Sequence, residues 1–408
     1  MKICVVHRYP PSLLETSDMS FPTFMSRLIE RGHKVYFLGF KEDGVISLLE
    51  SVCYEPINLT FNRVKKLDRN FKSVLFVFIV PFLAFRLAFK ENIDLFYCHD
   101  SLPGYGFLIK MAVNGRTRVV TRLGDLMTGY LLGEKNKIGN LLFKIVSCTE
   151  REMLKKVDGI INISNTFREF LIAQGLPQGK ISVVEESVDI TAFFSRKSGE
   201  RIRRRYGINK APLIVSHGIV VPWKGMETLL NAVPFVLKYV PNAKFIIVGD
   251  GPSLGSLKDL VRELRITDHV IFTGWVPYQR IPEYLGICDV GVVMRSGVLA
   301  NNFVLTTALL QLWACGKPVV APNLGAISQV VMHGENGLLF RPDDPEDLAE
   351  KIVYLIMNPN MARKFGEEGI MLARKKFDCR VIGEKFVVTI ESYARKEIKR
   401  QVVRSRGL

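Results

Sequence analysis

The chain has 408 residues, of which 48% are hydrophobic and 24% are charged. This length exceeds one ordinary core and fits two domains of roughly 150–200 residues, and the composition is that of a globular chain. The net charge of +16 favours an anionic partner, such as a nucleic acid, a membrane surface or a phosphorylated substrate. Of these we exclude nucleic acid, because the chain has no zinc spacing, aromatic-rich sheet signature or helix-turn-helix pattern. A charged surface that serves solubility alone is the alternative.

The sequence also bears on the compartment. Its seven cysteines are scattered and none forms a C-x-x-C pair, which predicts reduced core thiols. The opening residues, MKICVVHRYPP, lack the apolar stretch and the cleavage site of a signal peptide. We therefore expect a cytoplasmic protein.

Short apolar strands alternate with amphipathic helices through the first half of the chain, beginning with a β-α-β unit. This alternation predicts the α/β class, with a parallel sheet flanked by helices. Strands are expected at residues 2–7, 34–38, 94–98, 118–121, 159–163 and 181–184, and helices at residues 25–31 and 166–174.

One apolar segment complicates this interpretation. Residues 74–85, VLFVFIVPFLAF, carry no charge and lie between Lys72 and Arg86. A bilayer span needs about 20 apolar residues, whereas this run is shorter and contains Pro81. We expect a helix that is buried in the core or docked into a membrane surface, and not a span.

A basic stretch, residues 189–209, separates the two halves and has few large apolar residues. We interpret it as an exposed basic helix and linker; a phosphate site is the alternative. A second β-α-β series follows, and the tail after Phe377 should form a long helix. Strands are expected at residues 213–216, 244–248, 270–272, 289–293 and 318–321, and helices at residues 226–239, 254–264 and 345–357. The predicted domains are residues 1–195 and 196–375, with a C-terminal helix at residues 376–408 that returns to the first domain.

Three strand-to-helix turns of the second half should lie at one edge of the sheet, because the carboxyl ends of parallel strands meet there. They are residues 218–225, 249–252 and 295–307. In the first turn, Lys224 stands at the mouth of a helix, where its charge and unpaired backbone N–H groups can meet a phosphate. The second turn contains glycines, which allow a ligand to approach the backbone closely.

The third turn opens the helix TTALLQLWA, which Thr306 and Thr307 can cap. The unpaired N–H groups and the dipole of this helix favour an anion. Asn301 and Asn302 can exchange hydrogen bonds with sugar hydroxyls. Each feature alone is ordinary turn chemistry, but three such turns with a lysine at one edge predict a phosphate site.

The order of these motifs resembles the retaining glycosyltransferases of family 4, with their group 1 glycosyltransferase domain. The matching phrases are HGIVVPWKG (217–225), VGDGP (248–252), FTGWVP (272–277), RS (295–296), WACGKPVVAPNLG (313–325) and HGENGLLFRPDD (333–344). The first half matches more loosely, through MKICVVHRYPP, RGHKV (31–35), DGIINIS (158–164) and SVDITAFF (187–194).

The resemblance implies a GT-B fold, in which two Rossmann-like domains face a central cleft. The second domain would hold a nucleotide sugar and the first an acceptor. Neither a metal nor another cofactor is expected, because the sequence has no D-x-D motif and no cluster of histidines and carboxylates. The resemblance assigns Lys224 to the diphosphate, Val276 and its neighbours to the base pocket, and the 304–307 amides to the phosphate. Together with the chemistry of the three turns, it predicts donor binding by Lys224, Gly225, Gly249, Asp250, Gly251, Trp275, Val276, Pro277, Ser296, Asn301, Asn302, Thr306, Thr307 and Gln311.

Four charged positions of the family pattern are changed here. The arginine that accompanies the lysine falls on Ile219, and the carboxylates of the E-x7-E element fall on Phe303 and Gln311. A further acid falls on Gln329. Gln311 can still hydrogen-bond a ribose hydroxyl, more weakly than a carboxylate does.

The first domain offers substitutes for the missing charges. His99 follows one strand, and Arg122 and Asp125 follow another, in turns that should face the cleft. We predict these three as catalytic residues, with His7 and Arg8, after the first strand, as weaker candidates. The alternative is that Asp125 caps a helix and His99 is a satisfied loop residue.

The leading hypothesis is a glycosyltransferase that transfers a sugar from a nucleotide-sugar donor to a glycan or lipid-linked acceptor, as in polysaccharide biosynthesis. The apolar segment 74–85 and the basic residues of the tail after Phe377 favour attachment to an anionic membrane at its cytoplasmic face. The alternative is a catalytically reduced GT-B protein that binds a nucleotide sugar or a partner enzyme without transfer.

Overall fold

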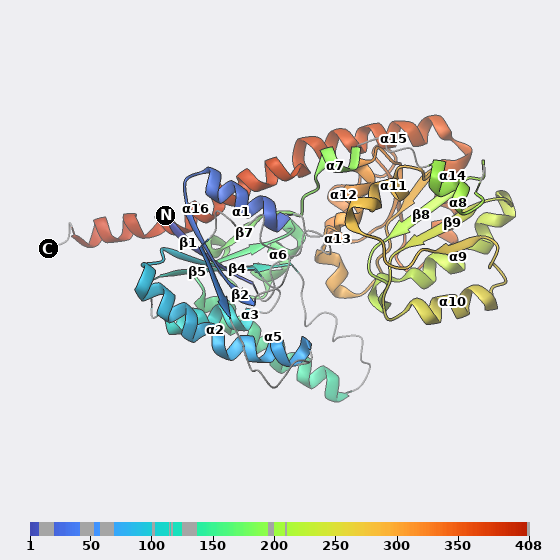
Figure 1. Ribbon diagram of the computed structural model, residues 1–408. Helices are drawn as coiled ribbons and strands as arrows, with labels where there is room; N and C mark the ends of the chain where they lie inside the picture. Colours follow the sequence, from blue (N-terminus) through green and yellow to red (C-terminus); the bar gives the residue numbers. More distant parts are fainter. Residues whose placement is uncertain are drawn as a thin grey trace. The chain divides into compact units, whose positions relative to one another are not determined.

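The computed structural model describes residues 1–7, 20–40, 53–57, 69–99, 103–113, 115, 117–124, 137–194, 200–208 and 210–405. These residues form two compact units, each visible in Figure 1. The N-terminal unit contains the described residues up to Glu185 and those from Ile382 onward. The C-terminal unit contains Glu186–Val381. The boundaries expected from the sequence, 195/196 and 375/376, lie near these divisions.

A parallel sheet of seven strands, in the order β3-β2-β1-β4-β5-β6-β7, forms the centre of the N-terminal unit. The central strands are mostly apolar because helices cover both faces of such a sheet. The strands are β1 (Lys2–Val6), β2 (Lys34–Phe40), β3 (Cys53–Ile57), β4 (Leu95–His99), β5 (Arg118–Leu123), β6 (Gly159–Asn162) and β7 (Ile181–Val183). The helices are α1 (Ser20–Glu30), α2 (Arg69–Glu91), α3 (Pro103–Ala112), α5 (Lys137–Lys156) and α6 (Asn165–Ala173). All six strands expected from the sequence are present; β3, CYEPI, was missed because it has no apolar run.

The long helix α16 (Cys379–Ser405) completes the core of this unit. The ring of Phe386 stacks on that of Phe24 from α1, with centroids 4.1 Å apart. The hydroxyl of Tyr393 donates to the carbonyl of Lys180 at 2.7 Å. Gly159 makes room for the Tyr393 ring, because a Cβ at that position would overlap it. These contacts tie the end of the chain to β6 and to the residue before β7.

The apolar segment 74–85 lies within α2, which continues through Pro81. One side of α2 is buried in the unit, so the predicted core burial is confirmed for that face. Its buried residues are Phe76, Val80, Ala84 and Leu87. Within the described part of the chain, no helix is long and apolar enough to cross a membrane.

The C-terminal unit is built on a six-stranded parallel sheet in the order β10-β9-β8-β11-β12-β13. Its strands are β8 (Leu213–His217), β9 (Lys244–Val248), β10 (Val270–Phe272), β11 (Val290–Val292), β12 (Val319–Pro322) and β13 (Leu338–Phe340). Its main helices are α9 (Met226–Tyr239), α10 (Leu254–Glu263), α12 (Thr307–Ala314), α14 (Pro345–Met357) and α15 (Pro359–Leu372). The five strands expected from the sequence are present, and the two sheets confirm the α/β class and the two Rossmann-like folds.

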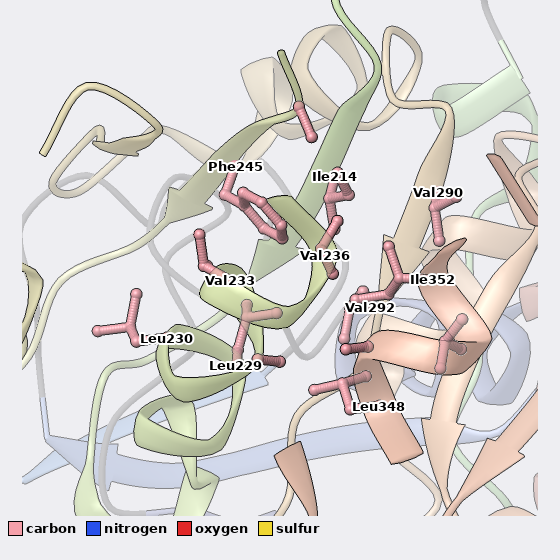
Figure 2. Close-up of a cluster of buried hydrophobic side chains, with 14 of the residues drawn as sticks. Ile214, Leu229, Leu230, Val233, Val236, Phe245, Val290, Val292, Leu348 and Ile352 are labelled. Carbon is pink, nitrogen blue, oxygen red and sulfur yellow. The ribbon is translucent and has the colours of Figure 1, made fainter. Parts of the chain in front are cut away.

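Apolar side chains of the strands and of two helices form one of the cores of this unit. Figure 2 shows Ile214 and Val292 from the sheet beside Val236 of α9 and Ile352 of α14. All four side chains are at most 1% exposed. The helical spacing of the apolar residues in α9 and α14 therefore determines which helix faces cover the sheet.

The basic stretch 189–209 contains the exposed basic helix expected from the sequence, with Arg201, Arg204 and Arg205 exposed, but part of the stretch is packed into the core and is not a free linker. It contains α7 (Ile190–Phe194) and α8 (Glu200–Arg205), and Phe193 and Ile202 are buried in the C-terminal core. The guanidinium of Arg203 donates to the carbonyl of Ile287 at 2.8 Å and to Asp289 at 3.0 Å. The described part of this stretch is thus packed into the C-terminal unit; residues 195–199 and 209 lie outside the description.

Packing in the C-terminal unit can be tested at two glycines. A Cβ at Gly369 in α15 would overlap the indole ring of the fully buried Trp313, whereas a Cβ at Gly255 in α10 meets no atom within 4 Å. We expect Gly369→Ala to destabilise the unit by about 1–3 kcal/mol through overpacking. Gly255→Ala, the matched control, should stabilise it by about 0.5–1 kcal/mol through helix propensity.

Urea unfolding followed by tryptophan fluorescence measures this difference. The three tryptophans of the chain, Trp223, Trp275 and Trp313, all lie in the C-terminal unit and report on it alone. Equal urea midpoints for Gly369→Ala and Gly255→Ala would contradict the packing of α15 against α12.

Candidate functional site

Two turns at the carboxyl edge of the C-terminal sheet are joined through their backbones. They follow the neighbouring strands β8 and β9. The N–H of Val220 donates to the carbonyl of Asp250 at 2.9 Å, and the N–H of Gly218 donates to that of Val248 at 2.9 Å. Gly249 lies so close to Gly218 that a Cβ would overlap its carbonyl oxygen. The two turns predicted to share this edge therefore form one rigid backbone surface.

The third turn, after β11, is tied to the first through Asn301. Its amide nitrogen donates to the carbonyls of Trp223 and Ser296, both at 2.8 Å, and its amide oxygen accepts from Arg295 at 2.9 Å. The hydroxyl of Ser296 also donates to the carbonyl of Trp223, at 3.0 Å. Asn301 is 0% exposed, so these bonds give it a scaffolding role that the sequence did not indicate.

Lys224 brings a positive charge to this edge. It ends the short helix η3 (Pro222–Lys224), and Gly225 follows in the left-handed conformation at φ +65°. A Cβ at Gly218 would lie 4.0 Å from the Lys224 ammonium, which places the charge over the end of β8. Gly225 also packs against Ser296, where a Cβ would lie 3.2 Å from the serine backbone.

The helix α12 begins at the same edge. Thr306 is its N-cap, and its hydroxyl accepts from the N–H of Ala308 at 3.4 Å. Thr307 is the first helical residue and is half-buried. The neighbouring Asn302 accepts from the N–H of Gly325 at 3.2 Å, which joins this turn to the loop after β12. The positive end of the α12 dipole thus lies at the edge that also carries Lys224.

A buried neutral pair, His217 and Gln311, lies behind these turns. The Nε2–H of His217 donates to the Gln311 amide oxygen at 2.6 Å, and both side chains are at most 7% exposed. Burial lowers the pKa of His217 to about 4. The hydrogen bond that His217 donates to Gln311 raises this pKa, and the positive charge of Lys224 lowers it further. His217 was not assigned from the sequence, although it begins the phrase HGIVVPWKG.

Arg295 is a second cation that the sequence assignment missed. It follows β11, is 8% exposed, and donates from Nη1 to Asn301. The acceptor, Asn301, is a neutral amide, so this hydrogen bond does not neutralise the charge of Arg295. The only indication in the sequence was its place in the phrase RS.

Three further donor-site candidates form the segment after β10. Trp275 is 59% exposed, and Val276 and Pro277 are half-buried. The N–H of Gly249 donates to the carbonyl of Gly274 at 3.1 Å, so this segment is attached to the turn after β9. The site therefore extends along the sheet edge from β10 to β12.

In the N-terminal unit, His99 is the last residue of β4 and Arg122 is the next-to-last residue of β5, so both lie in strands and not in the turns expected from the sequence. The two residues are paired in register. His99 bonds to the hydroxyl of Tyr97 at 2.8 Å, and its ring lies 5.5 Å from that of His7. Arg122 lies over the ring of Phe24 at 5.3 Å. The structure thus brings three predicted residues together, and two of them, His99 and Arg122, are buried. Arg8 and Asp125 lie outside the described residues.

Comparison with known proteins identifies the family. A family model described as "Glycosyl transferases group 1" matches residues 198–371, and one described as "Glycosyltransferase Family 4" matches residues 23–192. The chain belongs to these glycosyltransferases. The family resemblance seen in the sequence is therefore confirmed.

Individual relatives of this glycosyltransferase are distant. It is 25% identical over 347 residues to N-acetyl-alpha-D-glucosaminyl L-malate synthase of Bacillus anthracis, covering 84% of each chain. It is 25% identical over 253 residues to GDP-mannose-dependent alpha-(1-6)-phosphatidylinositol monomannoside mannosyltransferase of Mycolicibacterium smegmatis, covering 61% of this chain and 66% of that one. The structure of HepE from Anabaena in complex with UDP-glucose matches with a TM-score of 0.74 and 20% identity, over 96% of this chain and 100% of that chain. This likeness confirms the GT-B fold.

The changed positions of this glycosyltransferase now have locations. Ile219, where the family pattern has an arginine, is 57% exposed in the turn after β8. Phe303 is 4% exposed and ends the short helix η5 (Leu299–Phe303). Gln329 is exposed and follows α13 (Gly325–Ser328). The family carboxylates are thus replaced by a buried ring, an exposed amide and, at Gln311, an amide bonded to His217.

The neutral state of His217 has a consequence for stability. Its pKa lies below the unfolded value of 6.5, so below pH 6.5 the unfolded chain binds a proton that the folded chain does not. Stability should therefore fall as the pH drops from 6.5 to about 4, by about 3 kcal/mol from this residue. His217→Gln, which keeps a donor for Gln311, should lack this component.

The measurement is the unfolding free energy of the C-terminal unit, followed by tryptophan fluorescence, between pH 4 and 7 in both proteins. Carboxylates and the other histidines are common to both and cancel in the difference. If the unfolding free energy changed with pH in the same way in the unaltered protein and in His217→Gln, the buried neutral pair of His217 and Gln311 would be contradicted.

Proposed function

We propose that this glycosyltransferase binds a nucleotide sugar at the carboxyl edge of the C-terminal sheet and transfers the sugar to a glycan or lipid-linked acceptor. The observation that carries the proposal is that Lys224 and the capped N-terminus of α12 lie at the same edge of the sheet, where three turns are joined. Departure of the sugar leaves a diphosphate with increasing negative charge. Fixed cations and helix N–H groups stabilise that charge without reorganising.

Arg295 compensates in part for the arginine that is absent at Ile219. It stands after β11 with its charge unneutralised by Asn301, and Lys224 stands after the neighbouring strand β8. Together they give this edge a positive potential that favours a nucleoside diphosphate. Because the two cations already supply the charge, we expect transfer without a metal ion.

Gln311 would contact the ribose as a hydrogen-bond donor, whereas a carboxylate would act as an acceptor. His217 occupies its amide oxygen, so the amide N–H groups remain to donate to a ribose hydroxyl oxygen. A carboxylate at this position would instead accept from the hydroxyls. The base would lie against Trp275, Val276 and Pro277, and the diphosphate against the backbone of Gly249 and Gly251.

The acceptor would bind the N-terminal unit, with Arg122, His99 and Asp125 as the residues nearest the chemistry. The names of the two relatives include malate and phosphatidylinositol monomannoside, so both anionic and lipid-linked acceptors are candidates. The net charge of +16 fits either. A lipid-linked acceptor would require the protein to work as a peripheral protein at the cytoplasmic face of a membrane.

The donor site is tested by substituting Lys224. We expect Lys224→Met to weaken binding of the preferred nucleotide sugar by roughly 10- to 100-fold, because a hydrogen bond to a charged group contributes about 1.5–3 kcal/mol. Lys238→Met is the matched control: Lys238 lies in the last turn of α9, at the opposite edge of the sheet, and contacts the ring of Phe235. Calorimetry with UDP-, GDP- and ADP-sugars provides the measurement.

Equal losses in the two variants, or no binding of any of these donors to the unaltered protein, would contradict the donor site. Turnover is assayed separately, as release of the nucleotide with several acceptors. Binding without release across the acceptors would favour the catalytically reduced alternative.

A further inference from the structure

Helix α2 carries a continuous aromatic stripe on the side that faces away from its unit. Four phenylalanines repeat at spacings of four, three and four residues, which places them on one face of the helix. The exposed fractions are 74% for Phe78, 68% for Phe82, 42% for Phe85 and 46% for Phe89. The rings of Phe85 and Phe89 pack against each other, with centroids 4.6 Å apart.

The opposite face of α2 already supplies the packing that holds the helix in place. Phe76, Val80, Ala84 and Leu87 are at most 4% exposed, and Phe76 meets the ring of Tyr105 from α3. The packing of the core therefore does not require the exposed phenylalanines of the aromatic stripe. Large exposed apolar patches on soluble proteins mark surfaces that bind something.

The surroundings of the stripe are basic. Arg86 and Lys90 are exposed and follow on one flank, at roughly 80° and 120° around the helix from Phe78. Among its residues α2 has four basic side chains and one acidic one, Glu91, which accepts from the hydroxyl of Tyr36 and lies 3.9 Å from the Lys90 ammonium.

We propose that this face of α2 docks on an anionic lipid surface, with the phenylalanines among the acyl chains and Arg86 and Lys90 at the phosphates. An amphipathic helix with an aromatic face and basic flanks lies in the plane of a bilayer in this manner. A second copy of the chain fits less well, because pairing two identical stripes would bring like charges together in a molecule of net charge +16. This docking deepens the membrane attachment proposed above, but its test does not require sugar transfer.

Flotation of the full-length protein with lipid vesicles tests the docking. Vesicles of phosphatidylcholine alone are compared with vesicles that also contain phosphatidylglycerol, at low and high salt. The test variant is Phe78→Gln with Phe82→Gln. The control is Met357→Gln with Met371→Gln, which removes two exposed apolar side chains, 56% and 55% exposed, from α14 and α15.

The unaltered protein and the control should float with the phosphatidylglycerol vesicles at low salt. The phenylalanine variant should bind at least tenfold more weakly, and circular dichroism should show that it remains folded. Arg86→Gln with Lys90→Gln should lose about tenfold in binding to anionic vesicles, and high salt should remove the same component.

Absence of flotation of the unaltered protein at low salt would overturn the docking, and so would equal binding by the phenylalanine variant and the control. Self-association that the phenylalanine variant abolishes, without vesicle binding, would assign the stripe to a second copy. Vesicle binding without turnover would contradict the proposed transfer and leave the docking intact, and turnover without vesicle binding would do the reverse.

Discussion

The candidate site depends on a backbone contact between two glycine turns. Gly249 lies so close to the carbonyl oxygen of Gly218 that any side chain at position 249 would overlap that oxygen. Because the turns follow neighbouring parallel strands, this contact holds the ends of β8 and β9 in a single surface. Lys224 and Gly225 belong to the first of these turns, so the backbone determines where the side chain of Lys224 leaves this surface.

The polar residues behind this surface combine one cation, Arg295, with a neutral imidazole and two neutral amides. Asn301 bonds to Arg295, and Gln311 bonds to His217. In the family pattern carboxylates would stand at positions 303 and 311 and would offset part of the positive charge. Here the described turns keep the charges of Lys224 and Arg295 without those acids, which suits a ligand that brings its own negative charge.

The aromatic helix α2 shows how one apolar run serves two environments. Residues 74–85 are uniformly apolar, and the same residue type, phenylalanine, occupies the buried face at position 76 and the exposed face at positions 78 and 82. Periodicity of hydrophobicity cannot separate two faces that are both apolar. The sequence therefore left core burial and membrane docking as alternatives. The structure buries one side of the helix and exposes the other, and the proposed docking would use the exposed side.

The sequence alone determined the class, the two parallel sheets and eleven of their strands, since alternating apolar runs and helix periodicity are local properties. It also located Lys224, the glycine turns and the cap at Thr306, because strand ends and helix starts carry local signals. Only the tertiary structure revealed the pairing of His217 with Gln311, the scaffolding by Asn301 and the buried charge of Arg295. These depend on contacts between residues up to 94 positions apart, and burial, which sets the pKa of His217, arises only when distant segments pack together.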